Sequence, residues 1–213
     1  MKIKIFALTH KKFEVPQDKM YQPLQVGREE KEDLGYLCDN TGDNISAENC
    51  YYSELTGLYW IWKNVHTYKY VGTCHYRRYL LNEQEKIFTE AEYLELLKDY
   101  DLITTKRVVL NNSYHYGFAT NHNIHALDMT GEVIKELYPE YYDTFVQLVN
   151  GTETYFAEML KKRPDVLMEA SDITGELKLS MQIIATMDQE LQRTGHCYLR
   201  KENRFRELIT LFT

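Results

Sequence analysis

A cluster of basic and aromatic residues, HYRR at residues 75–78, is the strongest chemical signal in this sequence. It ends a short apolar run, YKYVGTCHYRRYL at residues 68–80, and a strand that ends in polar side chains is typical of a site. Arg77 and Arg78 would suit phosphate, because a guanidinium grips phosphate oxygens bidentately and stays protonated. We expect them to stabilise a diphosphate leaving group in place of a metal ion. The alternative is that they pair with carboxylates such as Glu54 and only stabilise the fold.

Groups that could deprotonate an acceptor hydroxyl form a second set, the carboxylates Glu54, Asp39 and Asp43. Glu54 lies in an otherwise apolar helical stripe, and such a carboxylate is either paired with a basic residue or placed for function. An inverting transferase needs a base of this kind, whereas a retaining one need not have a strong base. The residues do not decide between the two.

A third set, His122, His125 and Asp128, is spaced by three residues along a predicted helix over residues 122–138. Imidazole and carboxylate are ordinary ligands for zinc, manganese or iron, but a metal-binding helix more often uses a four-residue interval. We predict no metal site here and assign the three residues to the acceptor side, where His125 or Asp128 could act as a base. A metal-dependent hydrolase built on this set is an alternative.

The elements that must position these groups begin with a strand. Residues 2–8 are rich in β-branched and apolar side chains, which predicts a central strand that ends near Thr9. His10, Lys11 and Lys12 then fall at its C-terminal edge, where open α/β sheets place ligands. The run THKK is therefore a candidate nucleotide contact, although lysines that follow a strand can simply be solvated.

Residues 16–46 are polar and rich in turn signals, so we predict a long binding loop or lid. Ser46 is expected to cap a helix that runs to about Asn64. One face of this helix is predicted to hold Leu55, Leu58, Tyr59 and Trp62. Its aromatic side chains, Tyr59, Trp60 and Trp62, either stack on a sugar or base or belong to the core.

The remaining patterns predict helices over residues 89–100, 122–138 and 140–149, and a strand over residues 101–105. Composition indicates further helices over residues 155–170, 176–193 and 203–212. Alternating strands and helices favour an α/β fold with a mostly parallel central sheet flanked by helices. We expect a single domain, with residues 1–150 as a nucleotide-sugar-binding core and residues 151–213 as a helical C-terminal part.

The bulk composition narrows the function classes. A chain of 213 residues with 44% hydrophobic and 27% charged residues is globular, and its 18 tyrosines are a hint of stacking on bases or sugars. The net charge of −7 opposes generic binding to nucleic acid. The sequence has no apolar run long enough to cross a bilayer, and its four cysteines lack CxxC spacing. We expect a cytoplasmic protein with free thiols.

Several runs of the sequence together resemble the DUF4422 family: THKKF (9–13), YQPLQVG (21–27), DNTGDNIS (39–46), ELTGLYWIWKN (54–64) and VGTCHYRRYL (71–80). This family is similar to capsular and exopolysaccharide glycosyltransferases, and the resemblance implies a fold like that of the nucleotide-diphosphosugar (GT-A) transferases. It also implies a soluble bacterial-type enzyme that transfers a hexose from a nucleotide sugar to a growing polysaccharide or oligosaccharide.

The resemblance further implies a UDP sugar of the galactose type as donor and a lipid-linked oligosaccharide as acceptor, so the enzyme could visit the inner face of the membrane. No cofactor is required by the sequence, and a role for a divalent Mn²⁺ or Mg²⁺ ion is left open. The residues that match the family's motifs are Thr9, His10, Lys11, Asn44, Ser46, Glu54, Trp60, Lys63, Asn64, His75, Tyr76, Arg77 and Arg78. With Asp43 of the predicted lid, they form the expected donor site and catalytic group.

The C-terminal part departs from the family pattern. After Tyr155 the resemblance implies a strand of Asn-Met-Phe type and then a helix with a Trp-Leu-Phe element, whereas this chain has Ala157-Glu158-Met159 followed by lysine-rich residues without tryptophan. The alternative to an active enzyme is therefore a non-catalytic relative that binds nucleotide sugars or glycans and has a remodelled C-terminus.

Overall fold

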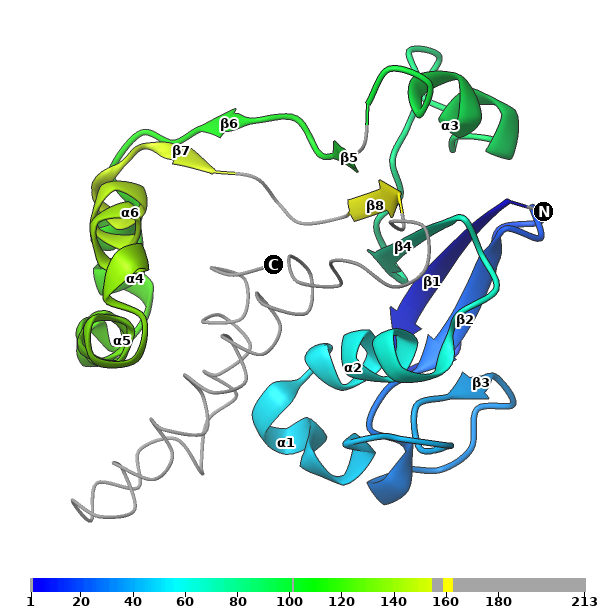
Figure 1. The fold of residues 1–213 in the computed structure, drawn as a ribbon, viewed down its shortest axis with the longest axis horizontal. Coiled ribbons are helices and arrows are strands. Elements are labelled where there is room, and N and C mark those ends of the chain that lie inside the picture. The colour runs from blue at the N-terminus through cyan, green and yellow to red at the C-terminus, as the bar shows by residue number, and fades with distance from the viewer. Residues whose placement is uncertain (1, 101, 155–158, 163–213) are drawn as a thin grey trace. The chain divides into compact units, whose positions relative to one another are not determined.

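The computed structural model describes residues 2–100, 102–154 and 159–162. These residues form two compact units, which we describe separately: residues 2–105 with a strand at 159–162, and residues 106–154 (Figure 1). The helices predicted over residues 176–193 and 203–212 lie outside the described residues, as does most of the C-terminal part predicted from residue 151.

The first unit is built on a six-stranded sheet in the order β3-β2-β1-β4-β8-β5. Strands β1, β2, β3 and β4 are parallel to one another, while β8 is antiparallel to both β4 and β5. The strand bounds are β1 (Ile3–Thr9), β2 (Tyr21–Gln25), β3 (Leu37–Cys38), β4 (Tyr70–His75), β5 (Leu102–Thr104) and β8 (Met159–Lys162). The α/β fold with a mostly parallel sheet is therefore confirmed.

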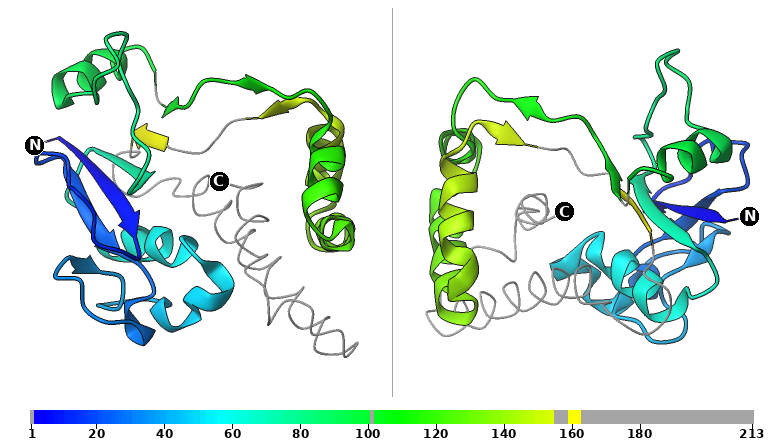
Figure 2. Two further views of the ribbon diagram at one scale, coloured as in Figure 1. Left: turned by 180° about the vertical axis from the view of Figure 1, so that it is seen from behind. Right: turned by 45° about the horizontal axis from the view of Figure 1, so that its top comes forward.

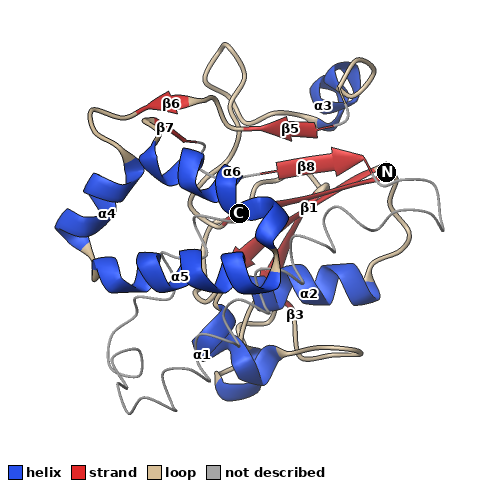
Figure 3. Ribbon diagram, turned by 60° about the vertical axis from the view of Figure 1, so that its left-hand side comes forward, coloured by secondary structure: helices blue, strands red, loops and turns tan. Residues whose placement is uncertain are grey.

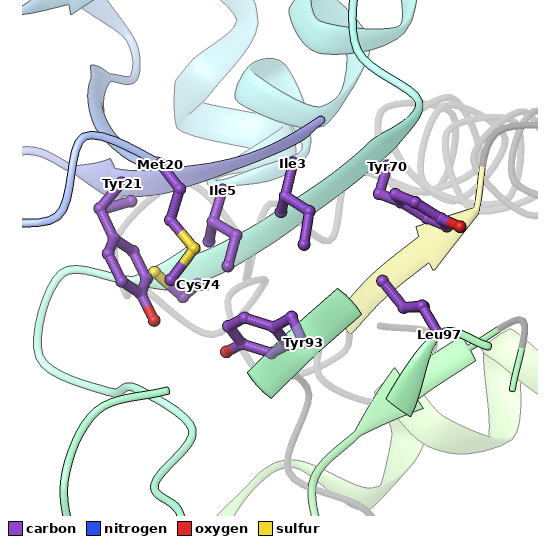
Figure 4. Packing of buried hydrophobic residues seen from close by; sticks show 9 residues of the cluster. Ile3, Ile5, Met20, Tyr21, Tyr70, Cys74, Tyr93 and Leu97 are labelled. Atoms are coloured by element: carbon purple, nitrogen blue, oxygen red, sulfur yellow. The ribbon is translucent and has the colours of Figure 1, made fainter. Parts of the chain in front are cut away.

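Strand β1 lies inside the sheet and is buried on both faces, which explains its nearly continuous apolar sequence. Ile3 and Ile5 point to one face, where Tyr93 and Leu97 complete a buried cluster (Figure 4). Phe6 and Leu8 point to the other face and pack in a cluster with Trp60, Ile61 and Val65. Residues that follow β1 in the chain thus cover it on both faces of the sheet.

The helices of this unit are η1 (Arg28–Glu30), η2 (Ser46–Glu48), α1 (Asn49–Tyr52), α2 (Leu55–Asn64) and α3 (Glu90–Leu96). Helix α3 starts at the predicted cap, Thr89, which forms a capping box with Glu92. Helix α2 presses Gly57 against the sheet, where an added Cβ atom would lie 2.7 Å from a methyl carbon of Val26. The core side of α2 therefore approaches the sheet most closely at Gly57.

Three predictions for residues 16–64 were wrong. The expected loop over residues 16–46 contains strands β2 and β3. The polar Gln25 can lie buried in β2 because its side-chain amide donates to the Glu32 carbonyl and accepts the Leu34 N–H. The single helix expected from Ser46 is interrupted at Ser53, which adopts φ 48° and ψ −124°. The buried face of α2 carries Thr56, Gly57, Trp60 and Ile61 beside Leu55, in place of Leu58, Tyr59 and Trp62.

The helix expected over residues 155–170 was also wrong where it can be compared, because residues 159–162 form strand β8 between β4 and β5. The strand that the family resemblance implied after Tyr155 is therefore present. The lysine-rich composition there favoured a helix, but pairing with two neighbouring strands outweighs such a weak propensity.

The described residues of the second unit form three helices and a two-stranded sheet, which Figures 2 and 3 show from further sides. The elements are β6 (Val108–Val109), α4 (Tyr114–Asn121), α5 (Ile124–Leu137), α6 (Pro139–Asn150) and β7 (Glu153–Thr154). Strands β6 and β7 pair antiparallel, and Phe118, Leu127 and Val149 pack where the three helices meet. Among the described residues, no helix is long and apolar enough to cross a membrane.

Candidate nucleotide site at the carboxyl ends of β1 and β4

The carboxyl ends of β1 and β4 lie side by side, because the two strands are parallel neighbours with Leu8 opposite His75 (Figure 1). The Tyr76 N–H continues this ladder by donating to the Leu8 carbonyl at 3.2 Å. The runs THKK and HYRR are therefore brought to the same edge of the sheet. This juxtaposition is the core of the candidate site.

Thr9 turns the chain at that edge but is itself buried, with 1% of its surface exposed. Its hydroxyl donates to the Lys11 carbonyl at 2.5 Å and accepts the Lys11 N–H at 3.0 Å. Thr9 thus shapes the loop that carries His10 and Lys11, and its own hydroxyl is engaged within the fold.

An array of aromatic rings joins the two loops. Tyr76 lies at its centre, with ring centroids 4.3 Å from His75, 5.5 Å from His10 in an edge-on arrangement, and 5.7 Å from Phe13. Phe13 is in turn held by Tyr36, whose hydroxyl donates to the Phe13 carbonyl at 3.2 Å. Such an array offers flat, half-buried faces on which a base or sugar could stack.

Positive charge gathers at the same edge. The side chains of Lys11, Lys12, Arg77 and Arg78 are exposed. The guanidinium carbon of Arg77 lies over the Tyr76 ring, 5.1 Å from its centroid, in a cation–π geometry. The Tyr76 ring and the Arg77 guanidinium therefore form one surface, which combines a stacking face with an anion-binding group.

His75 and Glu54 form a pair at the rim of this surface. The Nε2 atom of His75 lies 3.6 Å from Oε1 of Glu54, and the His75 side chain is 15% exposed against 44% for Glu54. On the other side of the ring, Nδ1 accepts the backbone N–H of Arg77 at 3.2 Å. Because Nδ1 is occupied as an acceptor, Glu54 is the better placed of the two to accept a proton from a substrate.

Asp39, one of the candidate bases, is a structural residue. It is fully buried and accepts four hydrogen bonds, from the backbone N–H groups of Gly27 and Arg28 and from the hydroxyls of Ser46 and Thr56. Because it is buried and both of its oxygens are taken by these four bonds, this carboxylate cannot reach a substrate as a base. Ser46, predicted to cap a helix and to bind the donor, is buried as part of this network.

The remaining predicted donor residues hold the loop of residues 40–45 onto α2. Asn64 accepts the Asp43 N–H at 3.2 Å and donates to the Asp43 carbonyl at 2.8 Å, and the Tyr59 hydroxyl donates to the Asp43 carboxylate at 3.0 Å. Lys63 lies 3.8 Å from the same carboxylate. The Asn44 amide bonds within its own turn, donating to the Gly42 carbonyl at 3.0 Å.

Trp60 lies in the core with 6% of its surface exposed, and its indole N–H donates to the Thr41 carbonyl at 2.9 Å. The structure therefore places Trp60 beneath the loop, in line with the core alternative for these aromatic residues.

His122, His125 and Asp128 belong to the second unit and do not share one helix. His122 caps the end of α4 and packs on Phe118, whereas His125 and Asp128 are exposed on α5. The predicted helix over residues 122–138 starts at Ile124, because Asn123 is its N-cap. Within the described part of the chain, no group of three or more His, Cys, Asp or Glu residues is arranged to hold a metal ion.

Phe13 and Tyr36 were missed as site residues. Phe13 closes the motif THKKF, and its position directly after the basic run was a usable signal. Tyr36 precedes β3, in a segment that was interpreted as a loop, so no strand end pointed to it.

Comparison with known proteins supports both the family and the fold. Residues 4–193 match the model of a family described as "Domain of unknown function (DUF4422)". Among solved structures, the chain is similar to the apo structure of WbbM, a bifunctional glycosyltransferase, with a TM-score of 0.71 and 23% sequence identity. The similarity covers 89% of this chain and 37% of WbbM. The comparison with curated proteins found no match.

Proposed function

Because the chain belongs to the DUF4422 family, and its fold is similar to part of a bifunctional glycosyltransferase, we propose that it is a glycosyltransferase that binds a nucleotide sugar where β1 and β4 end. The observation that carries this proposal is the juxtaposition of two polar loops at the carboxyl ends of neighbouring parallel strands. Ligands of open α/β sheets bind at that edge.

The composition of the surface supports a nucleoside diphosphate group. The aromatic rings centred on Tyr76 offer stacking to a base, and Arg77 and Arg78 offer forked donors for phosphate oxygens. Since phosphate carries most of the negative charge of such a donor, the exposed cations should supply most of the affinity. The finer proposal is a UDP sugar of the galactose type, in a site of the nucleotide-diphosphosugar (GT-A) kind.

The proposed reaction transfers the sugar directly from the nucleoside diphosphate to an acceptor hydroxyl. The acceptor hydroxyl oxygen bonds to the anomeric carbon while the bond from that carbon to the diphosphate oxygen breaks, and the nucleoside diphosphate leaves. Arg77 and Arg78 stabilise the charge that develops on the leaving group. In an inverting transfer, the hydroxyl proton passes to Glu54, the exposed carboxylate at the rim. The proposed acceptor is a lipid-linked or growing surface oligosaccharide.

A thermal-shift titration tests the proposal. The purified protein is titrated with UDP-, GDP-, TDP- and CMP-sugars, each with Mn²⁺ and with a chelator, because a ligand that binds only the folded state raises the Tm. We expect UDP-sugars to raise the Tm, and the chelator arm to show whether a divalent ion contributes. If no nucleotide sugar raises the Tm, the proposed function is wrong.

Turnover measurements, made beside this titration, separate the two alternatives. A protein that binds the donor but never releases nucleoside diphosphate in the presence of oligosaccharide acceptors would be a non-catalytic relative. A hydrolase that uses His125 and Asp128 would lose activity in the His125→Ala and Asp128→Asn variants and in chelator. We expect neither substitution to weaken donor binding, because neither residue is among those proposed to bind the donor.

A further inference from the structure

We infer that His75 is a positioning residue, which holds the backbone of Arg77, and that Glu54 fixes the tautomer of His75 that can do so. This inference rests on the proposed function, because it concerns how the same site presents Arg77 to the diphosphate. Two contacts on opposite sides of one imidazole ring carry it. The Arg77 N–H donates to Nδ1 at 3.2 Å, and Nε2 lies 3.6 Å from Oε1 of Glu54.

The tautomer follows from these two contacts. A nitrogen that accepts an N–H carries no proton, so in neutral His75 the proton lies on Nε2. That N–H faces the Glu54 carboxylate, which favours it electrostatically. In the opposite tautomer, an N–H at Nδ1 would face the Arg77 N–H, and a lone pair at Nε2 would face the carboxylate. Glu54 therefore selects the form of His75 that accepts from Arg77.

The backbone of Arg77 is held within a tight turn. The Arg78 N–H donates to the His75 carbonyl at 2.8 Å, while the Arg77 N–H is taken by the His75 ring. The Arg77 guanidinium then lies over the Tyr76 ring. A hydrogen bond thus holds the backbone of Arg77, and a cation–π contact orients its exposed guanidinium. Such preorganisation lowers the entropy that binding must overcome.

Two substitutions of His75 distinguish the positioning role from a general structural one. The side-chain oxygen of the His75→Asn variant lies near the place of Nδ1, so it can accept the Arg77 N–H. The amide of the His75→Gln variant reaches toward the place of Nε2 and does not replace that acceptor. We expect the Kd for UDP, measured by calorimetry, to stay within about threefold of wild type for His75→Asn and to rise about tenfold for His75→Gln.

A matched pair of Glu54 variants tests the contact between Glu54 and His75. Glu54→Gln retains an oxygen that can accept from Nε2–H, whereas Glu54→Leu has none. Imidazole ¹⁵N chemical shifts should therefore show the Nε2-protonated form of His75 in wild type and in Glu54→Gln, and a mixture of tautomers in Glu54→Leu. This measurement needs no ligand, so it stands even if no nucleotide sugar binds, the outcome that would sink the proposed function alone.

Three results would overturn the inference. The first is an Nδ1-protonated His75 in the wild-type protein, and the second is a His75 that keeps only the Nε2-protonated form in Glu54→Leu. The third is an equal Kd for UDP in His75→Asn and His75→Gln while wild type binds UDP. Where either His75 variant fails to fold, the tautomer measured in the two Glu54 variants still decides the question.

Discussion

The Ser46 hydroxyl donates a hydrogen bond of 2.5 Å to the buried carboxylate of Asp39, and this bond ties the start of η2 to the residue that follows β3. Gly27 and Arg28, which follow β2, donate their backbone N–H groups to the same carboxylate. The Asp39 network therefore joins the ends of two parallel strands to the layer that contains α2.

Replacing Asp39 should destabilise the protein. In Asp39→Asn one oxygen becomes an NH₂ group, which cannot accept hydrogen bonds from the donors that face it. We therefore expect a loss of about 2–4 kcal/mol in the free energy of unfolding. Urea denaturation followed by circular dichroism measures this loss. The control is Asp43→Asn, at an exposed position, which should cost less than about 1 kcal/mol. Equal losses in the two variants would contradict the structural role of Asp39.

Ser53 is a strained residue, because its φ of 48° with ψ −124° suits glycine. We expect Ser53→Gly to stabilise the protein by about 1 kcal/mol, since relief of strain exceeds the entropy that glycine adds to the unfolded chain. Ser53→Val, with a branched side chain, should lower the Tm. A lower Tm for Ser53→Gly would show that the backbone at this position is not strained.

Glu54→Gln should separate binding from turnover. The amide keeps an acceptor for the His75 Nε2–H but cannot take a proton from an acceptor hydroxyl. If the transfer is inverting, we expect kcat to fall about 100-fold or more, with the Kd for the donor changed less than threefold. Release of nucleoside diphosphate reports kcat, and calorimetry reports the Kd. An unchanged kcat would remove Glu54 as the base.

Glu92 should make the stability of α3 depend on pH. Hydrogen bonds from the Thr89 N–H, the Asn82 amide and the Thr89 hydroxyl lower the pKa of the Glu92 carboxyl. A lowered pKa means that the stabilisation is present above the unfolded-state value of about 4.3 and is lost as the pH falls through the folded-state pKa.

The measurement is the difference in Tm between wild type and Glu92→Gln as a function of pH. We expect a constant difference above about pH 5 that shrinks below about pH 4. Glu95→Gln, at an exposed position of the same helix, serves as the control. A difference that grows on acidification would contradict the direction of the Glu92 pKa shift.

Much of the site was predictable because it sits at the ends of two apolar strands. The sequence shows an apolar run over β1 and another that ends at His75. Parallel pairing of the two strands then brings the polar residues that follow them together. Strand β2 escaped prediction because Pro23 and two glutamines interrupt its pattern. The amide of Gln25 is satisfied only by the chain that folds back over it.

The sequence did not predict which motif residues are structural and which are free to contact a ligand. A motif contains residues that build the loop as well as residues that touch a ligand, and the sequence does not separate them. Burial does: Thr9, Ser46 and Trp60 are buried and hydrogen-bonded within the protein, whereas Arg77 and Arg78 are exposed. The break before Glu54 likewise falls on a serine, with no glycine or proline to signal it.

Calorimetric titration with UDP and with uridine shows whether the arginines at the end of β4 bind a diphosphate. Wild type should bind UDP far more tightly than uridine, and the Arg77→Ala/Arg78→Ala double variant should lose about 100-fold in UDP affinity with little change for uridine. If the double variant binds UDP as tightly as wild type does, the diphosphate lies elsewhere and the account is wrong.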